Sequence, residues 1–267
     1  MSTRMSDLET GQLIRSAAET YEQFFVPALF QEWPTRVLDA AAVASSDRVL
    51  DVACGTGVLA REAAERTETV VGIDLNEDML AVARRKTPNV QWRQGNAEAL
   101  PFEDDNFDAV VSQFGLMFFE NKITATSEML RVLRPGGRLA VATWDSIDHA
   151  PGYAAMKDLA VQLFGEELVS GFDAPFILGD RKTLCSIFEE AGVSNPQIST
   201  QEGTARYPSI QDWVYTDIKG WTLAGVLDDD QFDLLLREAK STLSRFVRPD
   251  GSVAFTAPAH IVCATKM

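Results

Sequence analysis

A glycine-rich turn between an apolar run and a helix-like segment is the first part of this chain that could do chemistry. The turn reads Asp51-Val52-Ala53-Cys54-Gly55-Thr56-Gly57 and follows the apolar residues from position 48. Glycine at a strand-to-helix turn lets a ligand approach the backbone, because no Cβ stands in the way. We therefore predict ligand contacts from Asp51, Ala53, Gly55, Thr56 and Gly57.

The carboxylate beneath this turn bears on the kind of ligand. Gly55, Gly57 and Ala60 also satisfy the spacing of a dinucleotide fingerprint, so the glycines alone are compatible with a nicotinamide cofactor. Asp51 instead favours a ligand that carries an ammonium group, because a carboxylate at this place would repel a pyrophosphate. Both alternatives stay open on these residues.

The next two strand ends carry polar residues suited to adenosine. Asp74 can accept hydrogen bonds from both ribose hydroxyls, or it can cap the following helix, although Asn76 is also placed for that. The loop after the third strand offers an amide, a carboxylate and a backbone N–H to an adenine ring. The candidate binding residues on this side are Asp74, Leu75, Met79, Gly95, Asn96, Ala97 and Glu98.

The end of the fourth strand supplies an amide and an apolar wall. Gln113 would lie beside the reacting group of the ligand, with Phe114, Met117 and Phe118 forming an apolar wall near it. The two phenylalanines also stand at helical spacing, so they could equally belong to the core.

The elements that must position these residues alternate in type. Ranges 48–53, 69–74, 89–93, 107–112 and 138–144 are β-branched apolar runs, and 58–66, 76–86 and 123–133 have helical spacing, with a Pro-Gly-Gly turn at 134–137. Apolar strands that alternate with helices are typical of a parallel sheet covered on both faces. The sequence therefore predicts a doubly wound, Rossmann-like α/β fold.

The pattern changes after Trp144. We expect helices at 153–164, 181–191, 209–221 and 232–246, an irregular apolar segment at 172–178, and strands at 193–207 and 259–265. The apolar face of the helix at 209–221 includes Trp221. The expected organisation is an N-terminal helical cover at 1–46, a cofactor-binding core at 47–145, a helical lid insertion at 146–180, and completion of the core sheet at 181–267 with a helical insertion near 209–247.

Composition excludes several classes of function. Apolar residues make up 46% and charged residues 24% of the chain, as in folded proteins. The 24 Lys and Arg against 39 Asp and Glu give a formal net charge of -15, which disfavours nucleic acid as a partner. No apolar run approaches the length of a membrane span, and no secretory signal is evident, so we expect a cytoplasmic protein. The 3 cysteines lack metal-ligand spacing, so we expect neither a metal site nor a disulfide framework.

Taken together, the segments DVACGTG, GIDL, GNAEALPF, FDAVVSQFGLMFF and LRVLRPGGRL resemble those of class I S-adenosylmethionine-dependent methyltransferases. The resemblance covers residues 15–145 best, and the most similar branch is that of the ubiquinone and menaquinone biosynthesis C-methyltransferases (methyltransferase type 11). It implies a seven-stranded sheet whose last strand is antiparallel, with S-adenosylmethionine as cofactor and S-adenosylhomocysteine as product. One departure is Ala53, which stands where the family usually has its first glycine.

The resemblance also implies an N-terminal helix that closes over the cofactor, with Tyr21, Phe25 and Trp33 as candidates for the cover; for Phe25, packing on the sheet is an equal alternative. The methyl acceptor is expected to be a small molecule, apolar or aromatic because the second half is rich in aromatic residues. If the acceptor must lose a proton, His149 is the best placed base, with Asp145 and Tyr153 as alternatives. His260 is expected to be structural.

Two other functions remain compatible with these residues. One is an NAD-dependent oxidoreductase, and the other is a protein that binds S-adenosylmethionine without turning it over. Neither the oligomeric state, monomer or homodimer, nor the methylated atom follows from the sequence.

Overall fold

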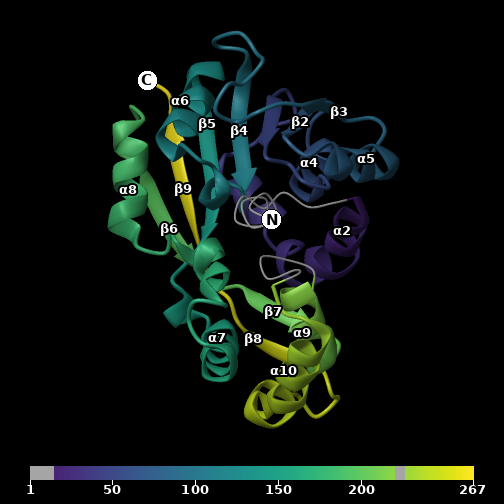
Figure 1. Ribbon diagram of the computed structural model, residues 1–267. Coiled ribbons are helices and arrows are strands. Elements are labelled where there is room, and N and C mark those ends of the chain that lie inside the picture. The colour runs from purple at the N-terminus through teal and green to yellow at the C-terminus, as the bar shows by residue number, and fades with distance from the viewer. Residues whose placement is uncertain (1–14, 220–225) are drawn as a thin grey trace.

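The computed structural model describes residues 15–219 and 226–267, and its centre is a seven-stranded sheet (Figure 1). The strand order is β3-β2-β1-β4-β5-β9-β6, and β9 is antiparallel to both β5 and β6 while the pairs among the first five strands are parallel. This confirms the predicted fold and its antiparallel last strand. The strands are β1 (Arg48–Val52), β2 (Thr69–Asp74), β3 (Gln91–Gln94), β4 (Phe107–Gln113), β5 (Leu133–Trp144), β6 (Gln197–Gln201) and β9 (Ala259–Thr265).

The order of the strands reverses between β1 and β4, which are neighbours although β2 and β3 lie between them in the chain. Ligands of such sheets bind outside the carboxyl ends of the strands at this switch point. The central strands β1 and β4 are almost entirely buried, as their apolar runs require, whereas the edge strands β3 and β6 are largely exposed. The helices connecting the strands of this half are α4 (Val58–Ala64), α5 (Glu77–Lys86), η2 (Leu116–Phe118) and α6 (Lys122–Val132).

The N-terminal part of the described chain lies next to α4 and α5. It consists of α2 (Arg15–Thr20), the π-helix η1 (Tyr21–Phe30) and α3 (Pro34–Ala40). Helix α2 packs on α5, and α3 packs on α4 and on strands β4 and β5. The side chain of Glu22 bonds Arg61 on α4 and Lys86 on α5 at 3.0 and 2.5 Å, which ties η1 to both helices.

A smaller unit, which we call the accessory lobe, lies below the main sheet in Figure 1. It contains α7 (Pro151–Phe164), α9 (Ile210–Lys219), α10 (Asp229–Thr242) and the strands β7 (Thr204–Tyr207) and β8 (Val253–Thr256), which pair antiparallel. Its centre is the fully buried Trp213, whose ring lies 4.7 Å from that of Phe255. The remaining elements are η3 (Ile147–His149), η4 (Ser170–Phe176), α8 (Arg181–Glu190) and η5 (Ser244–Phe246).

The predicted strand at 193–207 is wrong as a single element. It is divided at Gly203 into β6, which completes the main sheet, and β7, which belongs to the lobe; β8, the partner of β7, was not predicted. A Cβ on Gly203 would lie 2.6 Å from the carbonyl oxygen of Ala257, so the chain crosses between the sheets where only glycine fits.

Two other elements also differ from prediction. The Pro-Gly-Gly sequence at 134–137 is not a turn before the strand but an irregular part of β5, because Gly136 N–H donates to the Lys266 carbonyl and Lys266 N–H to the Gly137 carbonyl. The helix expected at 232–246 ends at Thr242, and η5 follows it. Trp221 lies outside the described residues.

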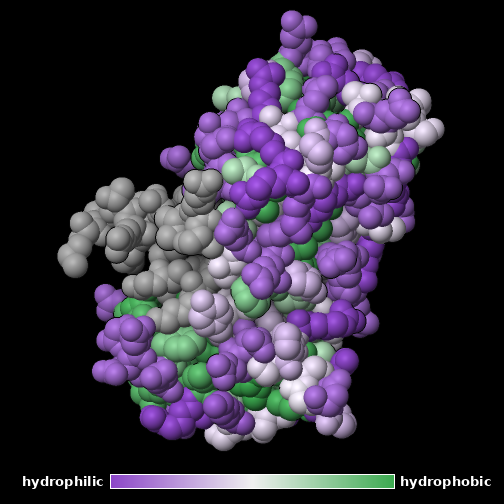
Figure 2. Space-filling view, turned by 90° about the vertical axis from the view of Figure 1, so that its right-hand side faces the viewer, coloured by the Kyte–Doolittle hydropathy of each residue, from purple (hydrophilic) through white to green (hydrophobic). Residues whose placement is uncertain are grey.

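The surface in Figure 2 is mostly hydrophilic in its upper part, and hydrophobic residues gather in its lower part. Within residues 15–219 and 226–267, no helix combines the length and the apolar character needed to cross a bilayer.

Candidate functional site

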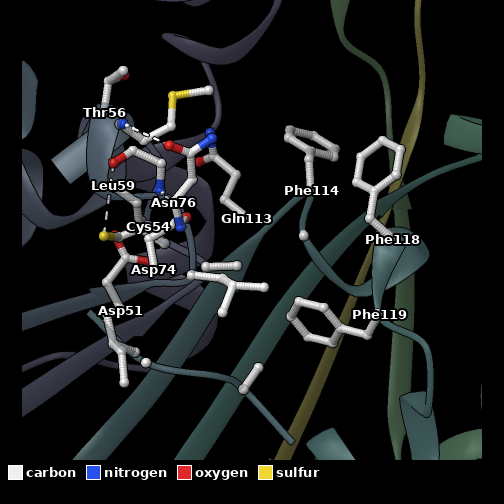
Figure 3. Close-up of a pocket in the computed structure, with 18 of the residues that line it drawn as sticks. Asp51, Cys54, Thr56, Leu59, Asp74, Asn76, Gln113, Phe114, Phe118 and Phe119 are labelled. Carbon is white, nitrogen blue, oxygen red and sulfur yellow. Dashed lines mark hydrogen bonds between the residues drawn. The ribbon is translucent and has the colours of Figure 1, made fainter. Parts of the chain in front are cut away.

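A cavity of about 250 Å³ lies at the carboxyl ends of β1, β2 and β4. Figure 3 shows two groups of side chains around it: Asp51, Thr56, Asp74 and Asn76 on one side, and three phenylalanine rings on the other. The predicted site residues that line the cavity are Tyr21, Asp51, Ala53, Gly55, Thr56, Asp74, Leu75, Met79, Gly95, Asn96, Ala97, Glu98, Gln113, Phe114 and Phe118.

Gly57 does not line the cavity, although it shapes the turn. It adopts φ +86° at the start of α4, and a Cβ there would lie 2.3 Å from the ring of Trp92. A Cβ on Gly72 of β2 would likewise lie 2.4 Å from this ring. Trp92 therefore packs across both glycines and fixes the turn from behind, so the role of Gly57 is conformational.

Asp51 is the most strongly buried charged group of the cavity, with 1% of its surface exposed. Its Oδ2 accepts the backbone N–H of Ala60 at 2.9 Å, whereas Oδ1 has no partner among the described residues. Burial raises the pKa of this carboxyl well above its usual range, because the charged form is deprived of water. A cation at the free oxygen would offset that cost.

Asp74 holds the neighbouring turn and helix start together. Its two oxygens accept the backbone N–H groups of Gly55 and Asn76, both at 2.8 Å. Burial raises the pKa of Asp74, and these backbone donors oppose that rise. The cap of α5 is Asn76, whose side chain accepts from Asp78 and Met79. Since a carboxylate offers about four lone pairs, Asp74 keeps capacity for ligand hydroxyls.

The loop at 95–98 forms the far end of the cavity. The side chain of Asn96 accepts the backbone N–H of Glu98 at 2.8 Å, and that of Glu98 accepts the backbone N–H of Asn121 at 3.0 Å. These bonds fix the loop, so Ala97 is presented to the cavity on a rigid backbone.

The opposite end is aromatic. Phe114 stacks on Trp144 with ring centroids 3.9 Å apart and adopts φ +56°, an unusual conformation for a bulky residue. Phe118 is the last residue of η2 and Phe119 follows it, and Gln113 lies between the two sides of the cavity (Figure 3). The Oε1 atom of Gln113 is buried without a partner among the described residues, as is Oγ1 of Thr56.

Of the three residues predicted to cover the cofactor, one lines the cavity. Tyr21 lines it, and burial keeps its phenol protonated by raising its pKa. Phe25 and Trp33 are fully buried and do not line the cavity: Phe25 stacks on Tyr21, and Trp33 packs edge-on against Phe114. Their place is therefore behind the lining residues, in the core.

One lining residue that the sequence did not predict is an aromatic residue of the N-terminal cover. Phe30, stacked on Tyr21 at 5.2 Å, lines the cavity in the place expected for Phe25. The other missed lining residues are Cys54, Val58, Leu59, Ile73, Asn76, Gly115, Phe119 and Glu120. Most are direct neighbours of predicted residues, a signal that the sequence contained.

The charges around the cavity are of one sign. Asp51, Asp74, Glu98 and Glu120 line it, and no Lys, Arg or His is among the described lining residues. Such a site would repel the pyrophosphate of a dinucleotide. Among the described residues, no three His, Cys, Asp or Glu side chains are grouped so as to hold a metal ion.

Comparison with known proteins agrees with the family resemblance of the sequence. A family model described as a methyltransferase domain matches residues 50–141. Demethylmenaquinone methyltransferase of Beutenbergia cavernae is 39% identical over 132 residues, which cover 49% of this chain and 55% of that protein. Ubiquinone/menaquinone biosynthesis C-methyltransferase UbiE of Photorhabdus laumondii is 35% identical over 191 residues, which cover 64% of this chain and 76% of that protein. The chain belongs to the class I S-adenosylmethionine-dependent methyltransferases.

The match spans about half the length of the first of these relatives. Among solved structures, phosphoethanolamine N-methyltransferase 2 of Haemonchus contortus in complex with S-adenosyl-L-methionine has the same fold, with a TM-score of 0.62 and 18% identity over 97% of this chain and 59% of that one. Ala53 adopts φ +56°, a left-handed backbone that glycine would take without strain.

The histidine considered as a base does not line the cavity. His149, whose side chain is 65% exposed, has Nδ1 at 2.9 Å from Oδ2 of the buried Asp145. The other oxygen of Asp145 lies 3.1 Å from Nε2 of His260, which is buried in β9. Tyr153 is not available as a base, because its hydroxyl is buried and bonded to that of Tyr207 at 2.8 Å.

Proposed function

We propose that this protein transfers the methyl group of S-adenosylmethionine to a small apolar or aromatic molecule bound beside the phenylalanine rings. The observation that carries the proposal is the group of buried, unpartnered oxygens at the cavity, on Asp51, Thr56 and Gln113. Buried polar atoms are rarely left without partners, so their clustering at one cavity favours a polar ligand that completes them.

The residues fit this cofactor in chemical terms. Asp51 would accept from its ammonium group and Asp74 from its ribose hydroxyls, while the rigid loop around Ala97 would hold the adenine. The acidic lining suits its positive charge, and Phe114 with Gln113 would lie near the sulfonium. The chemistry that the bound cofactor supplies is an activated methyl group.

The acceptor side is apolar in character. Phe30, Phe114, Phe118 and Phe119 line this end of the cavity, and η4 of the lid packs against η2, which carries Phe118. Such a wall favours an uncharged aromatic or aliphatic acceptor. The name of the Beutenbergia relative, demethylmenaquinone methyltransferase, supports an acceptor of this kind.

Thermal unfolding with added ligands tests the cofactor. S-adenosylmethionine and S-adenosylhomocysteine are expected to raise the midpoint, and NAD is expected to leave it unchanged, since a ligand stabilises only a state that binds it. A shift with NAD alone would favour the oxidoreductase. Transfer of a radiolabelled methyl group to a panel of quinols, phenols and amines then separates an enzyme from a protein that only binds the cofactor.

A further inference from the structure

Both histidines of this chain have a ring nitrogen close to one buried carboxylate, that of Asp145 directly after β5: Nδ1 of His149 lies 2.9 Å and Nε2 of His260 lies 3.1 Å from its oxygens. The carboxylate also accepts the backbone N–H of Ser146 at 2.7 Å. Its side chain is 8% exposed, that of His260 is 2% exposed, and that of His149 is 65% exposed. The group thus runs from the interior of the sheet to the surface, and its outer member is an imidazole.

The partners of each ring determine which nitrogen carries the proton. Nδ1 of His149 faces a carboxylate oxygen, which can only accept, so the proton is on Nδ1 and Nε2 keeps a free lone pair. Nε2 of His260 faces the carbonyl oxygen of Gly179 at 2.9 Å, so there the proton is on Nε2. Its Nδ1 accepts from the hydroxyl of Thr200 at 2.9 Å. The two histidines therefore have opposite tautomers.

We propose that His149 is the general base of the methyl transfer, that Asp145 is a positioning residue for it, and that the acceptor carries a phenolic hydroxyl. This rests on the proposed function. An imidazole whose inner nitrogen donates to a buried carboxylate, with the outer nitrogen free, is the arrangement by which enzymes orient a base. His260, opposite Thr143 of β5, lies beside the other oxygen of this carboxylate, while its own ring nitrogens are bonded to Gly179 and Thr200.

Trp144 connects the segment that carries His149 to the aromatic end of the cavity. Phe114 and Trp144 stack on each other at the carboxyl ends of neighbouring strands, and Asp145 directly follows Trp144. His149 does not line the cavity, so the acceptor would extend from the phenylalanine wall past Trp144 toward η3. A phenol combines the aromatic ring that this wall favours with the proton that a base removes.

The step balances without a further reactant. The hydroxyl proton passes to Nε2 of His149, and the electron density gained by the acceptor forms its new bond to the methyl carbon. The bond from that carbon to sulfur breaks, and its electron pair stays on sulfur. Because His149 is exposed, its proton can then pass to water. Methylation on a ring carbon instead requires that carbon's proton to leave afterwards, again to a base.

Nitrogen NMR of the imidazoles tests the arrangement independently of any activity. With only 2 histidines in the chain, the spectrum has two rings, and His149→Gln leaves one of them, which assigns both. The expected result is Nδ1–H for His149 and Nε2–H for His260. In Asp145→Asn the bond that fixes His149 changes, and its signal should move, whereas Asp148→Asn, which neutralises an exposed carboxylate on the same turn, should leave it in place. An Nε2–H tautomer at His149 would overturn the proposal.

Steady-state kinetics with S-adenosylmethionine and a phenol panel tests the role. His149→Gln should lower kcat by about 100- to 10,000-fold with little change in KM, and Asp145→Asn by about tenfold or more, while Asp148→Asn keeps the wild-type rate. Methylation of amines alone, or an unchanged kcat in His149→Gln, would overturn it. Wild type and His149→Gln should both be stabilised by the cofactor; loss of that shift in wild type would instead refute the proposed function.

Discussion

The cavity and the accessory lobe each bury one carboxylate that has no cationic partner among the residues that bond it. The two carboxylates differ in how many of their oxygens are hydrogen-bonded. In the lobe, the two oxygens of Asp217 accept from Tyr207 at 3.0 Å and from Trp213 at 2.6 Å. In the cavity, only one oxygen of Asp51 is bonded. Burial raises the pKa of both carboxyls, to about 7 for Asp217.

The difference shows that a raised pKa alone does not mark a functional site. Both oxygens of Asp217 accept hydrogen bonds from aromatic side chains, and the residue does not line the cavity, so its role is structural. Asp51 has an unsatisfied oxygen beside a cavity, where a ligand can complete it. Three of the seven buried side-chain atoms without a partner in the described chain line that cavity. The predictions below test this contrast.

Asp51→Asn should have the largest effect. The new amide can still accept from Ala60, but it places an N–H donor where the free oxygen was, toward the ammonium group of the cofactor. Loss of a buried ionic partner costs about 2–5 kcal/mol, so the Kd for S-adenosylmethionine should rise roughly 30-fold or more. Isothermal titration calorimetry measures it. Asp217→Asn is the matched control and should bind normally; a Kd for Asp51→Asn within threefold of wild type contradicts the assignment.

Asp217→Asn should instead change how stability depends on pH. The folded-state pKa of about 7 exceeds the unfolded value near 3.8, so this group stabilises the fold at low pH, and that contribution is lost as pH rises from about 4 through 7. The loss approaches about 4 kcal/mol, from about 1.4 kcal/mol for each pKa unit. Asparagine can still accept from Trp213 and donate to Tyr207, so the variant should lack this decline.

Denaturant unfolding of both proteins at pH 5 and pH 8 measures the effect as a difference between two curves, in which the contributions of Asp51 and Asp74 cancel. Equal pH dependence in wild type and Asp217→Asn would mean that Asp217 is ionised at little cost, and the contrast between the two carboxylates would then lose its basis.

The sequence predicted the sheet and the strand-end residues because both depend on local order: apolar runs separated by helices, and polar residues where each run ends. It could not predict Phe30. Helix η1 is a π-helix, whose i→i+5 bonding changes which residues share a face, and Phe25 had been chosen from the family resemblance alone. The break at Gly203 was also hidden, since it depends on a contact with Ala257, distant in the chain.

The surroundings of His149 show the same limit. Asp145 and His149 are four residues apart, so their contact was within reach of the sequence. His260 reaches the same carboxylate only because β9 pairs with β5 in a register that places it opposite Thr143. The prediction that His260 is structural did not include this contact, which no local pattern indicates.

The smallest expected effect comes from substituting a buried threonine whose hydroxyl has no hydrogen-bond partner. Thr56 and Thr143 each bury a hydroxyl with no partner among the described residues, but only Thr56 lines the cavity. Valine has nearly the same shape, so Thr56→Val should weaken S-adenosylmethionine binding by roughly 2- to 10-fold, the value of one hydrogen bond, and Thr143→Val should not. Neither change should lower the unfolding free energy, because each removes a polar group that gains nothing from the fold. If calorimetry gives Thr56→Val the same affinity as wild type, the hydroxyl of Thr56 contributes no more to binding than that of Thr143. Location at the cavity would then not identify an unpartnered atom as a ligand contact.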